Sequence, residues 1–373
     1  MDYTKNYNLK KPAAEDYYNI ADFNENSDTI DEKLLLGDNA LTLANQLLSR
    51  VKVLENNYSL LATKARILVT IYGPSGCNVS LTSGDSSCTA TIGSSMEVTL
   101  TVDNIGESRV KFTYMNASYT VKMQIDNTEH RFVAAPIPLS QASWAYIAKV
   151  SEHGLAQTCW KVGDTKKINV DGATADVHIL GFEHDNLYTP AEAPLVTARH
   201  DFTKAGISFG LVDILPTMYP IHPNKDDAVN WGTCDLRLKT LPALLASMDE
   251  GLQAAIKTVR KVTALPGANH DYYDYAWAAN GTAQVTDDKL FIFSERDLYG
   301  THRCSSPYIW YETPAYDYYR QGGTVVRSDS FWLRNSNYNS SGGVNYTLYV
   351  LTDNTINNRV NTSLLGLLFG FCV

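Results

Sequence analysis

The stretch FWLRNSNYNSSGGVNYTLYVLTDNTINNRVNTSLLGLLFGFCV, residues 331–373, decides the interpretation of this sequence. It begins with FWL and ends with FGFCV, which are apolar and rich in residues that favour strands, so we predict a core strand at each end. Between them, residues 335–363 consist mainly of Asn, Ser, Thr, Gly and Tyr. Antibody contact loops have this composition, because Tyr supplies stiff contact area and Asn and Ser supply adaptable hydrogen bonds. The stretch predicts either a binding surface between two core strands or polar hairpin turns without a ligand.

The whole chain has the composition of an ordinary globular protein. It has 373 residues, of which 44% are hydrophobic, and a net charge of -9. This length predicts two or three domains. Because the chain is acidic and has no long run of Lys and Arg, we expect no nucleic-acid partner. No apolar run reaches membrane-spanning length and the start, MDYTK, lacks the features of a signal peptide, so we expect synthesis in the cytoplasm and no membrane insertion.

The six cysteines lie singly along the chain. They form no CxxC pairs and have no histidines at the spacing of a zinc site. We therefore expect reduced, mostly buried thiols, no metal site and no cofactor.

The first part of the chain predicts an extended arm followed by a short coiled coil. In residues 1–38 a few aromatic and aliphatic residues interrupt a polar, acidic background, which is typical of an arm with anchor points. In residues 39–64 apolar residues alternate at spacings of four and three, which indicates a heptad seam. The seam consists of Ala40, Ala44, Leu47, Val51, Leu54, Tyr58 and Leu61. One amphipathic helix packed on a neighbouring domain remains the alternative.

Residues 65–127 predict a small β-sandwich of immunoglobulin-like type that acts as a spacer. Six short β-prone runs, over residues 66–72, 78–81, 88–92, 96–102, 110–114 and 119–125, are separated by Gly-rich turn signals. Residues 126–135 have the composition of a linker.

Residues 128–373 predict a larger α+β domain. Ser143 is placed to cap a helix that ends at His153-Gly154. We expect strands over residues 160–162, 167–170, 176–182 and 289–293, and a helical region over residues 241–264 with a break near Gly251.

The N-terminal segment carries a resemblance to a known family. NLKKP (residues 8–12), DYYNI (residues 16–20) and DFNENSDTID (residues 22–31) resemble the attachment segment of tail-fibre and receptor-binding proteins from phages of Gram-positive bacteria. The resemblance implies that the arm binds other tail proteins of the virion. It also implies a homotrimer, since such fibres are generally trimeric.

The C-terminal domain carries a second resemblance, spread over seven motifs in order. They are SWAYIA (143–148), VGDTK (162–166), ILGFEHDNL (179–187), KAGISF (204–209), DKLFIFSE (288–295), FWLR (331–334) and FGFCV (369–373). The set is similar to an uncharacterised domain family of phages and Firmicutes genomes. That family resembles the C-type-lectin-like fold of formylglycine-generating enzymes and of phage variable receptor-binding proteins, which implies a lectin-like fold here.

The candidate ligand-binding residues lie in and near the Asn-rich stretch. An aromatic cluster within residues 308–319 precedes it. Aromatic residues are candidates because their faces stack on sugars and because they contribute most of the binding energy in interfaces. In the cluster, Tyr318 and Tyr319 also fit a core position. The resemblance further implies a segment diversified by an adenine-directed retroelement, whose varied side chains must be exposed over a buried Trp332, Val350, Phe369 and Phe371. The predicted ligand-binding residues are Tyr308, Trp310, Asn337, Tyr338, Tyr346, Leu348, Asn357, Arg359 and Leu364.

The sequence contains only weak catalytic motifs, so we expect that the protein is not an enzyme. His184-Asp185 fits a strand-end turn in which Asp185 caps backbone N–H groups better than it fits a ligand or base pair. A glycan depolymerase needs two carboxylates at a defined separation, and no motif singles out such a pair. The main hypothesis is a receptor-binding protein of a phage tail fibre or tip, located in the virion, that binds a host cell-surface glycan or protein. A structural fibre or decoration protein without a dedicated ligand is the second hypothesis, and a depolymerase is the third.

Overall fold

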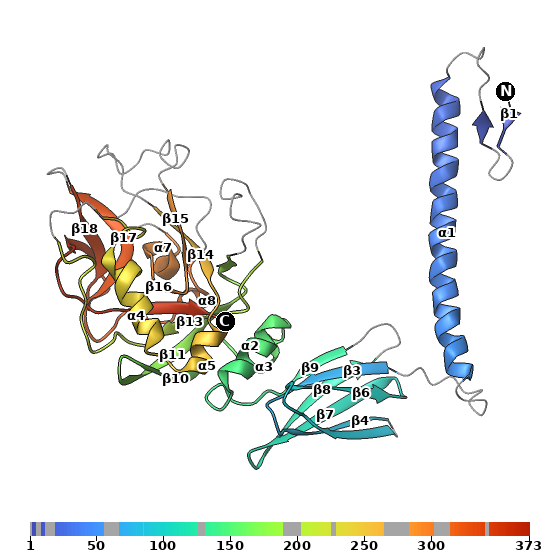
Figure 1. The fold of residues 1–373 in the computed structure, drawn as a ribbon, viewed down its shortest axis with the longest axis horizontal. Coiled ribbons are helices and arrows are strands. Elements are labelled where there is room, and N and C mark those ends of the chain that lie inside the picture. The colour runs from blue at the N-terminus through green and yellow to red at the C-terminus, as the bar shows by residue number, and fades with distance from the viewer. Residues whose placement is uncertain are drawn as a thin grey trace. The chain divides into compact units, whose positions relative to one another are not determined.

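The computed structural model forms two compact units, Met1–Ala65 and Arg66–Val373 (Figure 1). It describes residues 2–4, 9–11, 19–55, 67–84, 86–125, 131–188, 203–224, 229–264, 283–301, 314–339 and 343–373. Within these ranges, only the backbone is described for residues 47–55, 264, 283, 337–339 and 343–345. The described part of the chain is rich in β-structure, which forms several small sheets accompanied by short helices and one long one.

The first unit consists of a short hairpin and a long helix. Strands β1 (Asp2–Tyr3) and β2 (Lys10–Lys11) pair antiparallel, and the helix α1 spans Ile20–Glu55. Asn26 of α1 holds the hairpin, since its side chain accepts from the Lys10 N–H at 2.8 Å and donates to the Lys10 carbonyl at 2.9 Å. The Lys10 ammonium also pairs with Asp22 at 2.7 Å. None of the described helices, α1 included, is both long and apolar enough to cross a membrane.

The prediction of an extended arm over residues 1–38 is wrong from residue 20 onward. The Asn19 side chain accepts from the Ala21 N–H at 3.0 Å and so starts the helix. No proline follows within α1, and the helix continues through the polar, acidic residues to Glu55. The predicted coiled-coil segment forms the second half of the same helix, while its last seam positions, Tyr58 and Leu61, lie outside the described residues.

The second unit begins with two sheets that share a core. The strands are β3 (Ile67–Tyr72), β4 (Asn78–Ser83), β5 (Ser86–Thr91), β6 (Glu97–Val102), β7 (Gly106–Tyr114), β8 (Ala117–Ile125) and β9 (Arg131–Ala134). One sheet has the order β6-β3-β9 and the other has the order β5-β4-β7-β8. Val69, Ile71, Leu81, Val110 and Phe112 are buried between them, which follows from the period-two alternation of the sequence. The six predicted strands are confirmed.

A seventh strand corrects the prediction of a linker over residues 126–135. β9 pairs in parallel with β3, from Val69 opposite Arg131 to Tyr72 opposite Ala134. Beyond β9, the Tyr146 hydroxyl donates to the carbonyls of Tyr72 and Ala135 at 3.2 and 3.0 Å. This stretch is therefore held by the first sheet.

The C-terminal part of the second unit is built on a five-stranded sheet. Its order is β10 (Thr165–Val170), β11 (Ala173–Phe182), β13 (Ile207–Leu211), β20 (Phe369–Cys372) and β16 (Leu290–Ile292). β20 lies between β13 and β16 and pairs antiparallel with both. Gly370 is required there, since a Cβ atom would lie 2.9 Å from the Phe209 carbonyl oxygen and from the Phe291 ring. The predicted core strand at the C-terminal end is confirmed.

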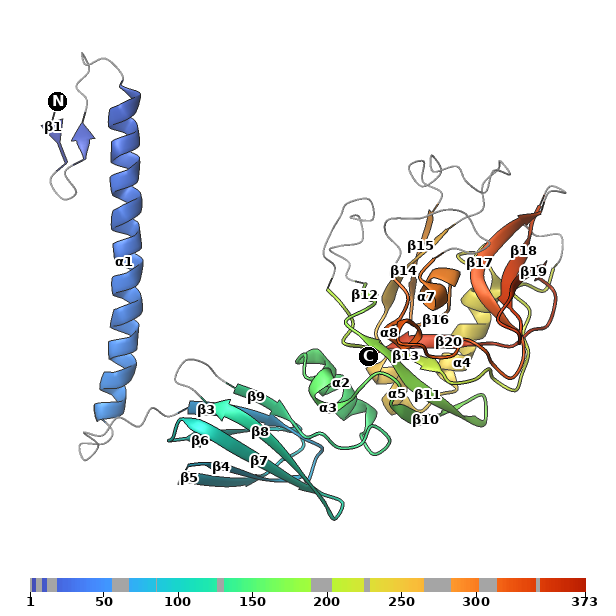
Figure 2. The same ribbon diagram turned by 180° about the vertical axis from the view of Figure 1, so that it is seen from behind.

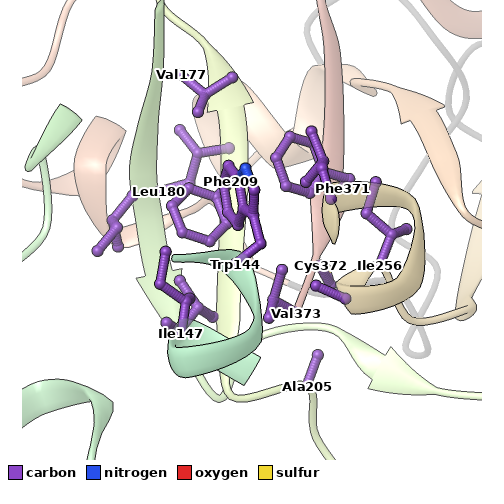
Figure 3. Packing of buried hydrophobic residues seen from close by; sticks show 14 of the residues in the cluster. Trp144, Ile147, Val177, Leu180, Ala205, Phe209, Ile256, Phe371, Cys372 and Val373 are labelled. Carbon is purple, nitrogen blue, oxygen red and sulfur yellow. The ribbon is translucent and has the colours of Figure 1, made fainter. Parts of the chain in front are cut away.

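Helix α2 (Trp144–Glu152) covers this sheet. As predicted, Ser143 caps it by accepting from the Tyr146 N–H, and His153 ends it. Its Trp144 ring packs edge-on against Phe209 and Phe371, with centroid distances of 5.5 and 5.9 Å (Figure 3). The final residue is also held, because the Val373 carbonyl accepts from the Ser151 hydroxyl at 2.7 Å.

Two three-stranded sheets complete the unit. One has the order β12 (Asn186–Leu187), β14 (Val259–Ala264) and β15 (Ala283–Asp288), and the other has the order β17 (Phe331–Asn339), β18 (Gly343–Val350) and β19 (Ile356–Val360). The remaining helices are α3 (Ala156–Cys159), the π-helical turn η2 (Leu236–Thr240), α4 (Leu241–Ala246), α5 (Glu250–Ala255), α7 (Glu295–Tyr299) and α8 (Asp317–Arg320). The predicted strand at 289–293 is confirmed as β16.

Two expectations for this part are wrong. The helical region over 241–264 ends at Ala255 and is followed by strand β14, while the predicted break near Gly251 is confirmed, because α4 ends at Ala246 and α5 begins at Glu250. β14 is a strand because it pairs along its whole length with β15, although three of its residues, Val259, Val262 and Thr263, are β-branched without regular alternation. Residues 160–162 form no strand, since Trp160 ends α3 instead and its indole donates to the Ile137 carbonyl at 2.9 Å.

Candidate functional site

The sheet β17–β18–β19 carries most of the described candidate residues, and Figure 2 shows its three strands side by side. β18 is central, and β19 is an edge strand of this sheet. Tyr346 of β18 is opposite Asn337 of β17 and Val360 of β19, and Tyr349 is opposite Asn357. The predicted residues of the Asn-rich stretch are therefore neighbours on adjacent strands.

Three consecutive side chains of β19, Asn357, Asn358 and Arg359, are exposed, and we call them the β19 surface. The Arg359 guanidinium lies 5.8 Å from the centre of the Tyr349 ring, within the range of a cation–π contact. Asn357 and Arg359 thus meet the expectation of exposure. Leu364, which follows β19, is 60% exposed and meets it too.

Leu348 corrects the prediction of a single exposed surface. It is 1% exposed, because β18 lies between β17 and β19 and both of its faces are covered at this point, where Thr347, Tyr349 and Val350 are buried as well. Tyr346 is half-buried. Since directly opposed residues share a face and neighbours along a strand alternate, Tyr346 and Leu348 lie on one face and Asn357 and Arg359 on the other.

The β19 surface rests on a rigid base. Trp332, Val350, Phe369 and Phe371 are fully buried, as the sequence predicts. The Trp332 indole donates to the Tyr219 carbonyl at 2.8 Å, and within the sheet the Thr347 hydroxyl donates to the Asn361 side chain at 2.9 Å. Side chains on the exposed edge can therefore change without disturbing these contacts.

The other predicted ligand-binding residues are only partly described. Asn337 and Tyr338 belong to the backbone of β17, while their side chains lie outside the description. Tyr308 and Trp310 lie outside the described residues. From the same aromatic cluster, Tyr319 is 9% exposed and belongs to the core as expected, and Tyr318 is half-buried. Tyr316, for which no core position was expected, is fully buried.

A second cluster was missed by the sequence interpretation and surrounds Asp185. The Asp185 carboxylate forms an ion pair with the Lys261 ammonium, and both side chains are fully buried. Its Oδ2 atom accepts from the Ser208 hydroxyl at 2.7 Å, the Tyr316 hydroxyl at 2.9 Å and the Cys372 thiol at 3.2 Å. The expectation that the Asp185 side chain caps backbone N–H groups is wrong, because its acceptor positions are occupied by these side chains.

The cluster has strongly shifted acidities. Burial raises the pKa of the Asp185 carboxyl, but the Lys261 charge and the His184 ring outweigh it and hold that pKa well below its usual range. Burial, together with the charge of Asp185, raises the pKa values of the Tyr316 hydroxyl and the Cys372 thiol. Lys261 and Asp185 are 76 positions apart, so no local motif could have joined them.

The cysteines and the possible metal ligands are the remaining groups that could carry chemistry. Cys77, Cys88, Cys159, Cys234 and Cys372 are free thiols, as expected, and three of them, Cys77, Cys234 and Cys372, are buried. Over the described ranges, no group of three or more His, Cys, Asp or Glu side chains is arranged to hold a metal ion.

No protein-family model matches the chain, and no curated protein matches it.

Proposed function

We propose that this protein is a receptor-binding protein of a phage tail, which binds a host cell-surface glycan or protein through its C-terminal domain. The β19 surface carries the proposal: Asn357 and Arg359 are exposed on one face of an edge strand and Asn358 on the other, while Trp332 and Val350 of the same sheet are fully buried. Asn offers both donors and acceptors, and Arg offers a planar set of donors, which suits hydroxyl-rich or carboxylate-bearing ligands. A lectin-like fold for residues 128–373 and an immunoglobulin-like fold for the preceding sheets are part of this proposal.

Helix α1 supports the assignment to a fibre of several chains. Ile20, Phe23, Ile30, Leu34 and Leu41 are each between 44% and 64% exposed in the single chain. Large apolar side chains along one helix are normally covered, and further copies of the same helix would cover them. We propose a homotrimer, with the hairpin β1–β2 at the start of the helix as the attachment to other tail proteins.

Adsorption to host cells tests the proposal. We expect the purified full-length protein to bind cells of a susceptible Gram-positive host and to compete with phage for them. The double variant Asn357→Ala, Arg359→Ala should bind at least about tenfold more weakly, since loss of two central polar contacts costs about 1.4 kcal/mol or more. Arg109→Ala with Lys122→Ala is the matched control, because both side chains are more than 60% exposed on β7 and β8, away from β19.

The alternative functions give different results in the same assay. A structural fibre or decoration protein would bind no host cells in either form. A depolymerase would release reducing sugar ends from host glycan, which a binding protein does not. Equal binding by the wild type and the β19 double variant would contradict the assignment of the β19 surface.

A further inference from the structure

The buried pair of Asp185 and Lys261 has the arrangement of two groups that can join covalently. Asp185 directly precedes β12, and β12 pairs antiparallel with β14 such that Asn186 is opposite Arg260 and Leu187 is opposite Val259. Continuing this register by one position places Asp185 opposite Lys261. The Lys261 ammonium contacts Asp185 Oδ1, so the nitrogen and the carboxyl carbon are held close in a fixed geometry.

The surroundings exclude water from the pair. Asp185 is 0% and Lys261 1% exposed. The Lys261 nitrogen lies 3.7 Å from the centre of the Phe291 ring and 5.3 Å from that of Tyr316. In such a medium two full charges lose much of their solvation. This loss narrows the free-energy difference between the ion pair and the neutral amine and carboxylic acid. Burial alone thus opposes the charged forms, whereas the Lys261 charge and the His184 ring keep the Asp185 carboxyl ionised until a proton is transferred within the cluster.

Tyr316 connects the two groups by a proton path. The Lys261 ammonium donates to the Tyr316 hydroxyl oxygen at 2.8 Å, and that hydroxyl donates to Asp185 Oδ2 at 2.9 Å. A proton can pass from the nitrogen to the tyrosine oxygen while the tyrosine proton passes to Oδ2. Because the transfer stays within the cluster, it creates a nucleophilic amine and a protonated carboxyl with no net change of charge.

Two further side chains donate hydrogen bonds to Asp185 Oδ2, the oxygen atom that would leave if the carboxyl became an amide. Besides Tyr316, the Ser208 hydroxyl and the Cys372 thiol donate to Oδ2, at 2.7 and 3.2 Å. Asp297 is a second buried carboxyl near Lys261: burial raises its pKa, but the charges of Arg334 and Lys261 outweigh burial and lower it. Its Oδ1 atom has no hydrogen-bond partner among the described residues.

We propose that Lys261 and Asp185 form an intramolecular isopeptide bond that covalently joins β14 to the start of β12. The Lys261 Nζ lone pair attacks Asp185 Cγ, the C–Oδ2 bond breaks, and a C–N bond forms. The nitrogen gives up two protons in total, both of which pass to Oδ2, which leaves as water. One ammonium and one carboxylate thus become one amide and one water molecule, without an oxidant or other co-reactant. Tyr316 acts as the catalytic residue, since it touches both reacting groups.

Intact-mass spectrometry of the denatured full-length protein tests the proposal. We expect a mass lower by one water molecule than the mass of the sequence, and after proteolysis a branched peptide that contains both Asp185 and Lys261. A mass equal to that of the sequence overturns the proposal and leaves an ordinary buried ion pair. A mass loss of one water that peptide mapping assigns to other residues, such as a succinimide at Asp171-Gly172, overturns the proposal as well. This measurement needs no variant and does not depend on the function of the protein.

Variants then test the mechanism. Tyr316→Phe removes the hydroxyl and preserves the ring, so bond formation should slow about a hundredfold or more, as for loss of a general acid–base group. Tyr319→Phe is the matched control, because its hydroxyl accepts from Arg327 and belongs to a neighbouring buried tyrosine outside the pair. Lys261→Arg retains the charge without a nucleophilic amine and should show the full mass. Cross-linking at the wild-type rate in Tyr316→Phe contradicts the role of Tyr316.

Discussion

His178 is a histidine of β11 that the fold keeps uncharged. It is 3% exposed, and its ring lies edge-on to Tyr318 at a centroid distance of 4.2 Å. Its Nε2 atom has no hydrogen-bond partner within the described part of the chain. Burial, followed by the Arg327 charge, lowers the pKa of His178 from 6.5 to about 4.

This histidine predicts a loss of stability in acid. Between its unfolded and folded pKa values the unfolded chain binds a proton that the native chain does not, so the free energy of unfolding falls as the pH falls through that range. From about pH 7 to about pH 5, we expect the wild type to lose about 2 kcal/mol more than His178→Gln, which cannot titrate. Urea unfolding of both proteins at the two pH values measures the difference. An equal loss in both proteins would show that His178 is not the cause.

Arg334, the last residue of the FWLR motif, holds three elements together. Its guanidinium pairs with Asp297 of α7, donates from Nε to the Thr263 hydroxyl of β14 at 2.9 Å, and donates from Nη1 to the Ile292 carbonyl of β16 at 3.1 Å. Both side chains of the ion pair are 1% exposed. Breaking a buried pair leaves the remaining charge without compensation.

Arg334→Met should therefore lower the free energy of unfolding by about 3 to 5 kcal/mol. Arg359→Met is the control, since Arg359 is exposed on β19 and should change stability by no more than about 0.5 kcal/mol. Chemical denaturation of the two variants compares them directly. Similar stabilities would mean that the hydrogen bonds of Arg334 contribute little.

At the scale of elements, the start of α1 changes the position of the helical seam. With the helix beginning at Ile20, the positions at alternating spacings of three and four from residue 20 to residue 51 are apolar except for Ser27 and Gly37. The positions are Ile20, Phe23, Ser27, Ile30, Leu34, Gly37, Leu41, Ala44, Leu48 and Val51. This seam is longer than the one predicted from residues 40–61 and shares only Ala44 and Val51 with it. A longer seam buries more apolar surface between chains, so we favour it.

The two seams make different predictions. Ile30→Asp with Leu34→Asp places charges in the longer seam and should reduce the protein to single chains, whereas Leu47→Asp with Leu54→Asp should do so only if the shorter seam is correct. Leu36→Asp with Leu43→Asp is the matched control, since these leucines are 52% and 57% exposed and lie outside both seams. Light scattering after size-exclusion chromatography measures the mass of each variant. An unchanged mass for the Ile30 and Leu34 variant would refute the longer seam.

At the scale of the whole molecule, the fold separates positions that can vary from positions that cannot. Sequencing this gene across a phage population should show substitutions at adenines of the Asn codons in residues 335–368, with exposed Asn357 and Arg359 among the varied positions. Leu348 lies in the same segment but is buried, so it should vary far less. Substitutions spread evenly along the gene would contradict diversification by a retroelement and leave the proposed binding function intact.

Much of the fold was predictable because its signals are local. Six strands over residues 66–125, the Ser143 cap, and the terminal FWL and FGFCV strands each follow from a period, a cap or a turn within a few neighbouring residues. Exposure of Asn357 and Arg359 was predictable from polar composition. The burial of Leu348 was not predictable, since whether one face or both faces of a strand are covered depends on the elements that pack against it.

Tertiary structure alone determined the features that join distant parts of the chain. β9 is a strand because β3 offers it a free edge, and residues 259–264 are a strand because β15 pairs with them, although both segments lack a decisive local pattern. Asp185 has the sequence context of a turn residue, yet the fold surrounds it with Lys261, Ser208, Tyr316 and Cys372. The sequence by itself determined where strands and helices could form, because propensity acts between near neighbours. Which buried charges meet is determined only when the sheets assemble, because the free energy of a buried charge depends on the partners that the whole fold places around it.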